Sequence, residues 1–311
     1  MILKQLADSL KEQINSRVLN QENLTELALT AMFAGGHILI EGVPGLAKTL
    51  WARSFAQLIN ADFKRVQFTC DLVPSDILGT KFFNPQSAQF ELRKGPLFSQ
   101  LFLADEINRT PPKTQSALLE VMEERAITID GQTHAMQEPF FVMATQNPLE
   151  FEGTYPLPEA LTDRFMMKIS VTYPGVAAEK QMLLAHHSRE LFLREFSPIC
   201  GAEHIVHAKR EIESVIVDDA IFNYIISIIE TTRRVGAVQF GASPRGSVAL
   251  LLAAKTFAAM RGRDFVIPDD IHALSPPILR HRIVIKPEAE IEGITPDQVI
   301  ENILAQVKPP R

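Results

Sequence analysis

The fold is decided by Gly42-Val43-Pro44-Gly45-Leu46-Ala47-Lys48-Thr49, which follows the apolar run His37 to Glu41 and precedes a helical pattern from Thr49 to Ile59. A strand, a glycine-rich loop and a helix in this order are the context that a phosphate-binding loop requires. The N–H groups of such a loop and of the helix N-terminus can surround phosphate oxygens. Lys48 can then reach the β and γ phosphates of a nucleotide, and the Thr49 hydroxyl can ligate Mg²⁺.

The predicted nucleotide contacts of this loop are Gly42, Val43, Pro44, Gly45, Leu46, Ala47, Lys48, Thr49 and Leu50. Ala47 occupies the position before the lysine where glycine is usual. Its methyl group is small, so we expect the loop to tolerate it. The alternative interpretation is an ordinary Gly/Pro turn that happens to end in Lys-Thr.

A second polar element follows the apolar run Leu101 to Ala104, where the chain continues as Asp105 and Glu106. Asp105 is predicted to hold Mg²⁺, directly or through water, while Glu106 can accept a proton from the attacking water. Acidic residues also end many strands simply because they are solvated. Their place on another predicted parallel strand assigns these two carboxylates to the same site as Lys48.

Three further residues are candidates for catalysis. Asn147 follows the apolar run Phe140 to Ala144, and its amide could orient the attacking water, although an Asn-Pro turn is the ordinary alternative. Arg164 precedes a predicted strand and Arg245 begins a predicted helix. A guanidinium stabilises the charge that develops on a transferred phosphoryl group, and a neighbouring molecule can supply it. For either arginine taken singly, a surface ion pair is the alternative.

Short apolar strands separated by helices predict an α/β domain with a parallel sheet covered on both faces. The predicted strands are His37 to Glu41, Arg65 to Thr69, Leu101 to Ala104, Phe140 to Ala144 and Met166 to Val171. Two connections, Lys81 to Lys94 and Ala126 to Gln137, are expected to project from the sheet, the second as a hairpin turning at Asp130-Gly131.

After about Val171 the pattern becomes helical, which predicts a smaller all-helical domain. Its predicted helices are Ala177 to Leu193, Asp218 to Arg234, Pro244 to Met260 and Pro268 to His281. The length of 311 residues suits two domains, which we place at residues 1–172 and 173–311.

Composition narrows the class of protein. The net charge of −6 argues mildly against a protein whose main task is holding nucleic acid. Cys70 and Cys200 are too few for a disulfide framework and are expected to be free thiols, which points to the cytoplasm. No apolar run approaches 18 residues, so a membrane span is not expected.

In this order the motifs resemble those of AAA+ ATPases and, within them, of the MoxR family. The resemblance extends over nearly the whole chain and is most specific in EGVPGLAKT (41–49), GPLFSQLFLADEINRTPPKTQSALLEVMEE (95–124), ATQNP (144–148), LPEALTDRF (157–165) and GASPRG (241–246). Alanine before the P-loop lysine is usual in that family. The resemblance implies a P-loop sheet of strand order 5-1-4-3-2, a helical lid, and ATP held between the two.

The resemblance also implies a role for each site residue. Lys48 and Thr49 match Walker A, Asp105 and Glu106 match Walker B, Asn147 matches sensor 1, Arg164 matches the arginine finger that acts in trans, and Arg245 matches sensor 2. Residues 81–94 match the helix-2 insert and residues 126–137 the hairpin before sensor 1. Family members typically form hexamers, often beside von Willebrand factor A domain proteins, and remodel or activate protein clients, frequently to install a metal or cofactor.

Two other functions stay open on the sequence. One is an AAA+ ATPase that remodels nucleic acid, which the acidic balance disfavours. The other is a binding module that ATP switches without being hydrolysed, which Glu106 disfavours.

Overall fold

Five parallel strands form the central sheet of the computed structural model, which describes residues 2–148, 153–187 and 197–310. These strands are β1 (Ile38–Glu41), β2 (Phe63–Gln67), β5 (Leu101–Asp105), β8 (Phe141–Gln146) and β9 (Met167–Ser170). Their order across the sheet is β2-β5-β8-β1-β9. Numbered along the chain within this sheet, the order is 5-1-4-3-2, so the predicted topology is confirmed.

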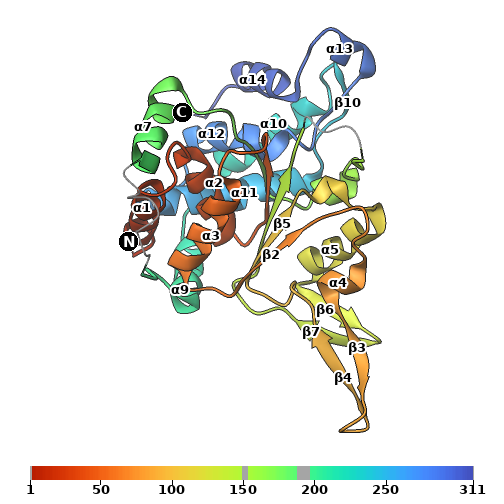
Figure 1. Cartoon of the computed structure of the whole chain (residues 1–311). Coiled ribbons are helices and arrows are strands. Elements are labelled where there is room, and N and C mark those ends of the chain that lie inside the picture. Colours follow the sequence, from red (N-terminus) through yellow and green to blue (C-terminus); the bar gives the residue numbers. More distant parts are fainter. Residues whose placement is uncertain (1, 149–152, 188–196, 311) are drawn as a thin grey trace.

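The central strands β1, β5 and β8 are buried on both faces, and their alternate residues contribute to two different cores. Ile38 and Ile40 of β1 pack in one core with α1 (Ile2–Asn15), α2 (Glu22–Phe33) and α3 (Lys48–Ile59). Leu39 packs in the other core, with α5 (Pro112–Glu124). Figure 1 shows α2 and α3 on one side of the sheet, and α5 and the short helix α4 (Pro74–Leu78) on the other.

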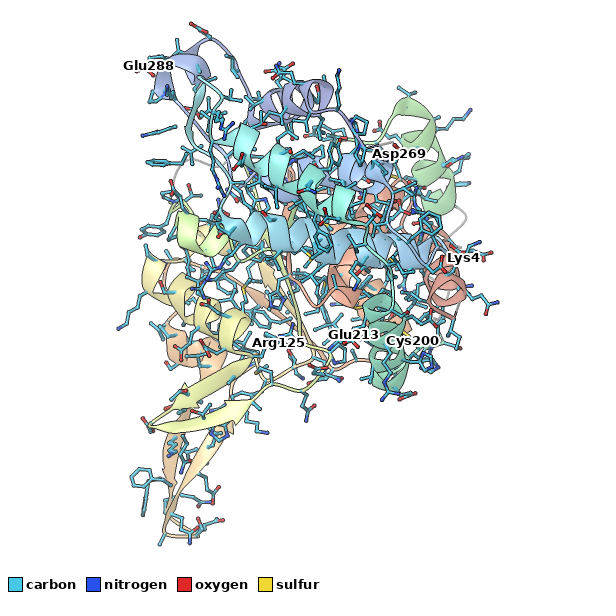
Figure 2. All side chains as sticks on the ribbon, turned by 180° about the vertical axis from the view of Figure 1, so that it is seen from behind. Lys4, Arg125, Cys200, Glu213, Asp269 and Glu288 are labelled. Carbon is cyan, nitrogen blue, oxygen red and sulfur yellow. The ribbon has the colours of Figure 1, made fainter. Side chains whose placement is uncertain are left out.

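The two predicted projections are both β-hairpins. Residues 79–94 form β3 (Gly79–Asn84) and β4 (Gln89–Lys94) after the short helix α4 (Pro74–Leu78), and residues 126–135 form β6 (Ala126–Ile129) and β7 (Gln132–Ala135). Asp130 and Gly131 both have positive φ, as a two-residue hairpin turn requires. The β3–β4 hairpin extends far beyond the body of the molecule (Figures 1 and 2).

The second half of the chain is largely helical, as expected. Its helices are α7 (Val176–His187), α9 (Ala202–Glu213), α10 (Asp219–Thr232), α11 (Pro244–Met260), α12 (Pro268–Leu279), α13 (Pro287–Ile291) and α14 (Pro296–Gln306). Residues 188–193 of the predicted helix Ala177 to Leu193 lie outside the described residues. One difference is a short antiparallel pair, β10 (Val238–Phe240) with β11 (Val284–Ile285), whose strands are too short for a periodic pattern to indicate.

The N-terminal helices connect the two parts of the molecule. Both α1 and α2 pack against the lid helix α11 as well as beside the sheet. A division between residues 172 and 173 therefore stays a prediction. Among the described residues, we find no helix that could span a membrane.

Candidate nucleotide-binding site

The loop between β1 and α3 owes its shape to three residues with small side chains. At Gly42, an added Cβ would lie 2.7 Å from the backbone oxygen of Val171, the residue directly after β9. At Gly45, φ is +88°, and at Ala47 it is +56°, in the left-handed region that favours glycine. The usual glycine before the lysine is thus explained by backbone conformation, and Ala47 adopts this conformation at a steric cost.

Lys48 and Thr49 are the first two residues of α3, and their side chains reach the loop and the end of β5. The Lys48 ammonium donates to the backbone oxygen of Gly42, so it is folded back over the loop. Burial lowers the pKa of Lys48, and the nearby carboxylates of Asp105, Glu106 and Glu41 oppose that effect. The Thr49 hydroxyl donates to Asp105 Oδ2 at 3.2 Å, which joins the helix start to the end of β5.

Asp105 receives hydrogen bonds on both carboxylate oxygens. The Thr145 hydroxyl of β8 donates to Oδ1 at 2.6 Å. Arg65 of β2 donates to Oδ2 through Nη2 at 2.8 Å and through Nε at 3.0 Å. The carboxylate therefore lies at the point where side chains from β2, β5, β8 and α3 meet.

Glu106 is held by its backbone and by its side chain. It has a left-handed φ of +57°, and its N–H donates to the Thr145 hydroxyl at 2.8 Å. Its Oε2 accepts from Gln67 Nε2 at 2.6 Å and from Arg109 Nη1 at 3.1 Å. Thr145 thus fixes both carboxylate residues, and Gln67 and Arg109 fix the direction of the Glu106 side chain.

These residues surround a cavity of about 370 Å³. It is lined by Pro44, Gly45, Leu46, Ala47, Lys48, Thr49, Leu50, Arg65, Gln67, Asp105, Glu106, Thr145 and Asn147. Most of the predicted loop contacts are thereby brought together with Asp105, Glu106 and Asn147. Gly42 and Val43 do not line it.

A second cavity of about 330 Å³ lies on the other side of the same loop. Pro44 to Ala47 line both cavities. The remaining walls come from the start and the middle of the chain, namely Leu19, Gln21, Tyr173, Pro174, Glu179 and Met182. Gln21 donates from Nε2 to the backbone oxygen of Leu46 at 3.4 Å, which ties this wall to the loop.

Neither predicted arginine lines the cavity around Lys48. Arg164 and Arg245 instead contact opposite oxygens of Glu123 near the end of α5, the second of them at 2.8 Å. Arg164 also donates to the backbone oxygen of Leu119 at 3.1 Å. The two arginines, 81 positions apart in sequence, therefore form one cationic pair around a single carboxylate.

The oxygen atoms at the cavity suit a magnesium ion. Thr49 supplies a hydroxyl and Asp105 a carboxylate, which are the ligand types that Mg²⁺ prefers when it also binds phosphates. Among the described residues, no cluster of three or more His, Cys, Asp or Glu residues could hold a metal ion by itself. The residues present fit a magnesium ion that arrives with a nucleotide.

Three residues of the site, Arg65, Gln67 and Thr145, were not predicted from the sequence. Arg65 and Gln67 are two positions apart on β2, so they share one face of the strand. Two polar residues at that spacing on the strand beside β5 were the available signal. For Thr145, its place near the end of β8, two residues before the predicted amide of Asn147, was the signal.

Comparisons with known proteins agree with this architecture. Residues 37–167 match the family described as "ATPase family associated with various cellular activities (AAA)", and residues 230–303 match the AAA lid domain. Chaperone MoxR1 of Mycobacterium tuberculosis is 40% identical over 96% of this chain and 81% of its own length. Protein MoxR of Methylorubrum extorquens is 29% identical over 93% of this chain and 91% of its own length.

The comparison with solved structures gives the same result. The crystal structure of a Cytophaga hutchinsonii protein has a TM-score of 0.90 and 40% sequence identity. The match covers 99% of this chain and 96% of the other. The likeness therefore includes the lid as well as the sheet.

Proposed function

Because the chain belongs to the MoxR family of AAA+ ATPases, we propose that it hydrolyses ATP with Mg²⁺ and uses this cycle to remodel or activate protein clients. One observation carries the proposal. Lys48, Thr49 and Asp105 meet at a single cavity, with the Thr49 hydroxyl 3.2 Å from Asp105. Glu106, the candidate base, lies at the same cavity.

The two cavities on either side of the loop suggest how ATP would lie. The phosphates would occupy the polar cavity around Lys48, and the adenine base would occupy the cavity walled by Gln21 and Tyr173. The loop residues common to both cavities would then run beside the ribose and the phosphates. The apolar walls and the Gln21 amide suit a flat base with a few hydrogen-bonding groups.

Magnesium would be held by Thr49 and Asp105 together with phosphate oxygens, and it would neutralise charge on the phosphates. Lys48 would leave the Gly42 oxygen and bind the phosphates, which are the stronger acceptor. Glu106 would accept a proton from the attacking water, and Asn147 would orient that water.

The two arginines support an assembly of several copies. Since Arg164 and Arg245 are bound to Glu123 and lie outside the cavity of their own chain, we propose that both act on the nucleotide of a neighbouring copy. An arginine supplied in trans stabilises the charge of the transition state. This arrangement requires an assembly of at least two copies, and the family resemblance favours a hexameric ring.

The hairpins provide a surface for clients. Phe83 and Phe90 are 52% and 71% exposed and stack edge to face across β3 and β4, with ring centroids 5.5 Å apart. Exposed aromatic residues on a projecting element are typical of protein contact sites. A von Willebrand factor A domain partner and installation of a metal or cofactor in the client follow from the resemblance alone.

The use of ATP and the presence of two cysteines without a disulfide bond suit the cytoplasm as the place of action.

Hydrolysis is tested by comparing ATP turnover in wild type and Glu106→Gln, with Glu124→Gln at the exposed end of α5 as the matched control. Glu106→Gln should bind ATP and lose turnover by about a hundredfold or more, because its amide accepts no proton. Glu124→Gln should match wild type. Equal turnover in wild type and Glu106→Gln would refute the assignment, and turnover that requires added DNA would favour nucleic-acid remodelling.

A further inference from the structure

The turn after lid helix α12 holds the backbone on which Arg164 is carried. Arg282 lies in this turn, and its side chain is only 3% exposed. A guanidinium has five N–H groups in a fixed plane, so it can fix several acceptors at once. The groups that accept hydrogen bonds from Arg282 therefore identify the segment that this residue holds in place.

The acceptors of Arg282 lie mostly around Arg164. Nε donates to Asp163 Oδ1 at 2.9 Å, and Nη2 donates to the backbone oxygens of Asp163 and Phe165 at 2.9 and 2.8 Å. Nη1 donates to the backbone oxygen of Met166 at 3.0 Å and also to that of Ile278. Arg282 thus holds the backbone immediately before and after Arg164.

Other lid residues support the same segment. Ser243 donates to Asp163 Oδ2 at 3.2 Å, and Arg245 lies 3.7 Å from that oxygen. The His281 ring bonds to the backbone oxygen of Phe165 at 2.9 Å. Burial lowers the pKa of Arg282, and the Asp163 carboxylate opposes that effect. The lid therefore contacts this segment through side chains from both α11 and the turn after α12.

Arg164 itself has no hydrogen bond to Arg282 among the described contacts, since it bonds to Leu119 and Glu123 on α5. Arg164 is carried on the backbone that Arg282 holds on both sides. A buried cation with several hydrogen bonds resists displacement, and a misplacement of about 1 Å in a catalytic group can lower a rate by about a hundredfold. Movement of the lid would accordingly move the backbone of residues 163–166.

We propose that Arg282 is a positioning residue that sets the direction of Arg164, so that the lid of one copy controls the nucleotide site of the next copy. This inference rests on the proposed trans action of Arg164. It concerns Arg282 rather than Arg164, so the positioning role of Arg282 can be refuted while the trans action of Arg164 holds.

The test uses mixed assemblies of two variants. Arg282→Gln keeps its own nucleotide site and loses the hold on residues 163–166, whereas Glu106→Gln keeps its arginines and loses hydrolysis. Alone, Arg282→Gln should show kcat lowered by about tenfold to a hundredfold with KM for ATP unchanged. Mixed with Glu106→Gln, it should recover turnover well above the sum of the separate variants. In the mixture, Glu106→Gln copies supply a correctly placed Arg164 to neighbouring Arg282→Gln copies, whose own Glu106 is intact.

Two controls separate the possible failures. Arg164→Ala mixed with Glu106→Gln tests the trans action itself, and no recovery there would refute that part of the proposed function. Arg263→Gln breaks the 2.5 Å ion pair with buried Asp270 inside the lid, away from residues 163–166. It should lower the melting temperature without lowering kcat. A matching fall in kcat would show that any weakened lid has this effect and would overturn the inference.

The inference is also overturned if Arg164→Ala is rescued in the mixture and Arg282→Gln is not, or if Arg282→Gln alone keeps the wild-type rate. If Arg282→Gln does not fold, Asp163→Asn replaces it in the same mixture. This variant removes the negative charge that pairs with Arg282 and keeps the size of the side chain. It should show a smaller loss of kcat that Glu106→Gln again restores, and absence of either effect counts against the positioning role.

Discussion

Arg65 donates two hydrogen bonds to Asp105 Oδ2, at 2.8 and 3.0 Å, on the same oxygen that accepts from Thr49. A positively charged side chain therefore occupies the carboxylate that is proposed to ligate magnesium. Hydrogen bonds between charged groups are stronger than neutral ones, so a metal ion must compete with this pair.

Removing Arg65 should therefore favour the metal. In Arg65→Ala, we expect the Mg²⁺ concentration that gives half-maximal ATP turnover to fall by about threefold to tenfold, because one charged hydrogen-bond donor no longer competes. A magnesium titration of turnover at saturating ATP measures this. Arg93→Ala, on the exposed hairpin strand β4, is the control and should show no shift. A higher magnesium requirement in Arg65→Ala would mean that Arg65 assists the metal.

Ala47 has φ of +56°, a conformation that costs an alanine about 1–2 kcal/mol and a glycine little. Ala47→Gly should therefore raise stability by about 0.5–1 kcal/mol after the greater flexibility of glycine in the unfolded chain is subtracted. The melting temperature without nucleotide measures the gain. A lower melting temperature would show that the Ala47 methyl group contributes packing that outweighs the backbone cost.

His37 should make the stability of the protein depend on pH. Its ring bonds to the backbone oxygen of Met122 at 3.3 Å and accepts from the N–H of Val142 at 3.1 Å, and burial lowers its pKa to about 4. The folded protein thus keeps His37 neutral, while the unfolded chain binds a proton below its ordinary pKa of 6.5. The contribution to stability is complete above about pH 6.5 and declines towards about pH 4, by up to about 1.4 kcal/mol per pH unit.

The measurement is the melting temperature of wild type and His37→Gln between about pH 7.5 and 4.5, a range that spans the ordinary histidine pKa. The glutamine side chain retains a donor and an acceptor but does not titrate, so the melting temperature of the variant should fall less steeply with acid. Parallel curves for the two proteins would show that His37 does not contribute.

The exposed pair Phe83 and Phe90 should contribute to client binding and not to ATP hydrolysis. Replacing Phe83 and Phe90 by serine in the Glu106→Gln background should reduce the amount of client retained in ATP, because the exposed rings are removed. Phe240→Ser, on lid strand β10 with 59% exposure, is the matched control. In an otherwise wild-type chain the two serines should leave basal turnover unchanged, and equal retention of client by all variants would exclude the hairpin as a contact.

The sequence alone predicts the sheet and the centre of the site well, for local reasons. The strands that lead to Asp105 and to Asn147 begin as continuous apolar runs, and Lys48 follows a loop whose glycine pattern is specific. Parallel strands end at the same edge of a sheet, so these groups could be expected to meet. The cavity lined by all three agrees with that expectation.

The remaining features depend on contacts between distant residues. Nothing local indicates that Glu123 binds both Arg164 and Arg245, or that Asp163 is held by Arg282, 119 positions away. The pair of β10 and β11 involves strands of three and two residues, which show no periodicity. Such features follow from the packing of the lid, which the sequence pattern does not specify.

The central claim is that a triphosphate binds beside Lys48 and faces Asp105. Calorimetric titration of wild type and Lys48→Ala with ATP and Mg²⁺ tests it most directly. We expect wild type to bind one nucleotide per chain, and Lys48→Ala to bind about a hundredfold more weakly, since a charged phosphate contact is lost. Equal affinity of the two proteins, or no heat of binding in wild type, would contradict the account.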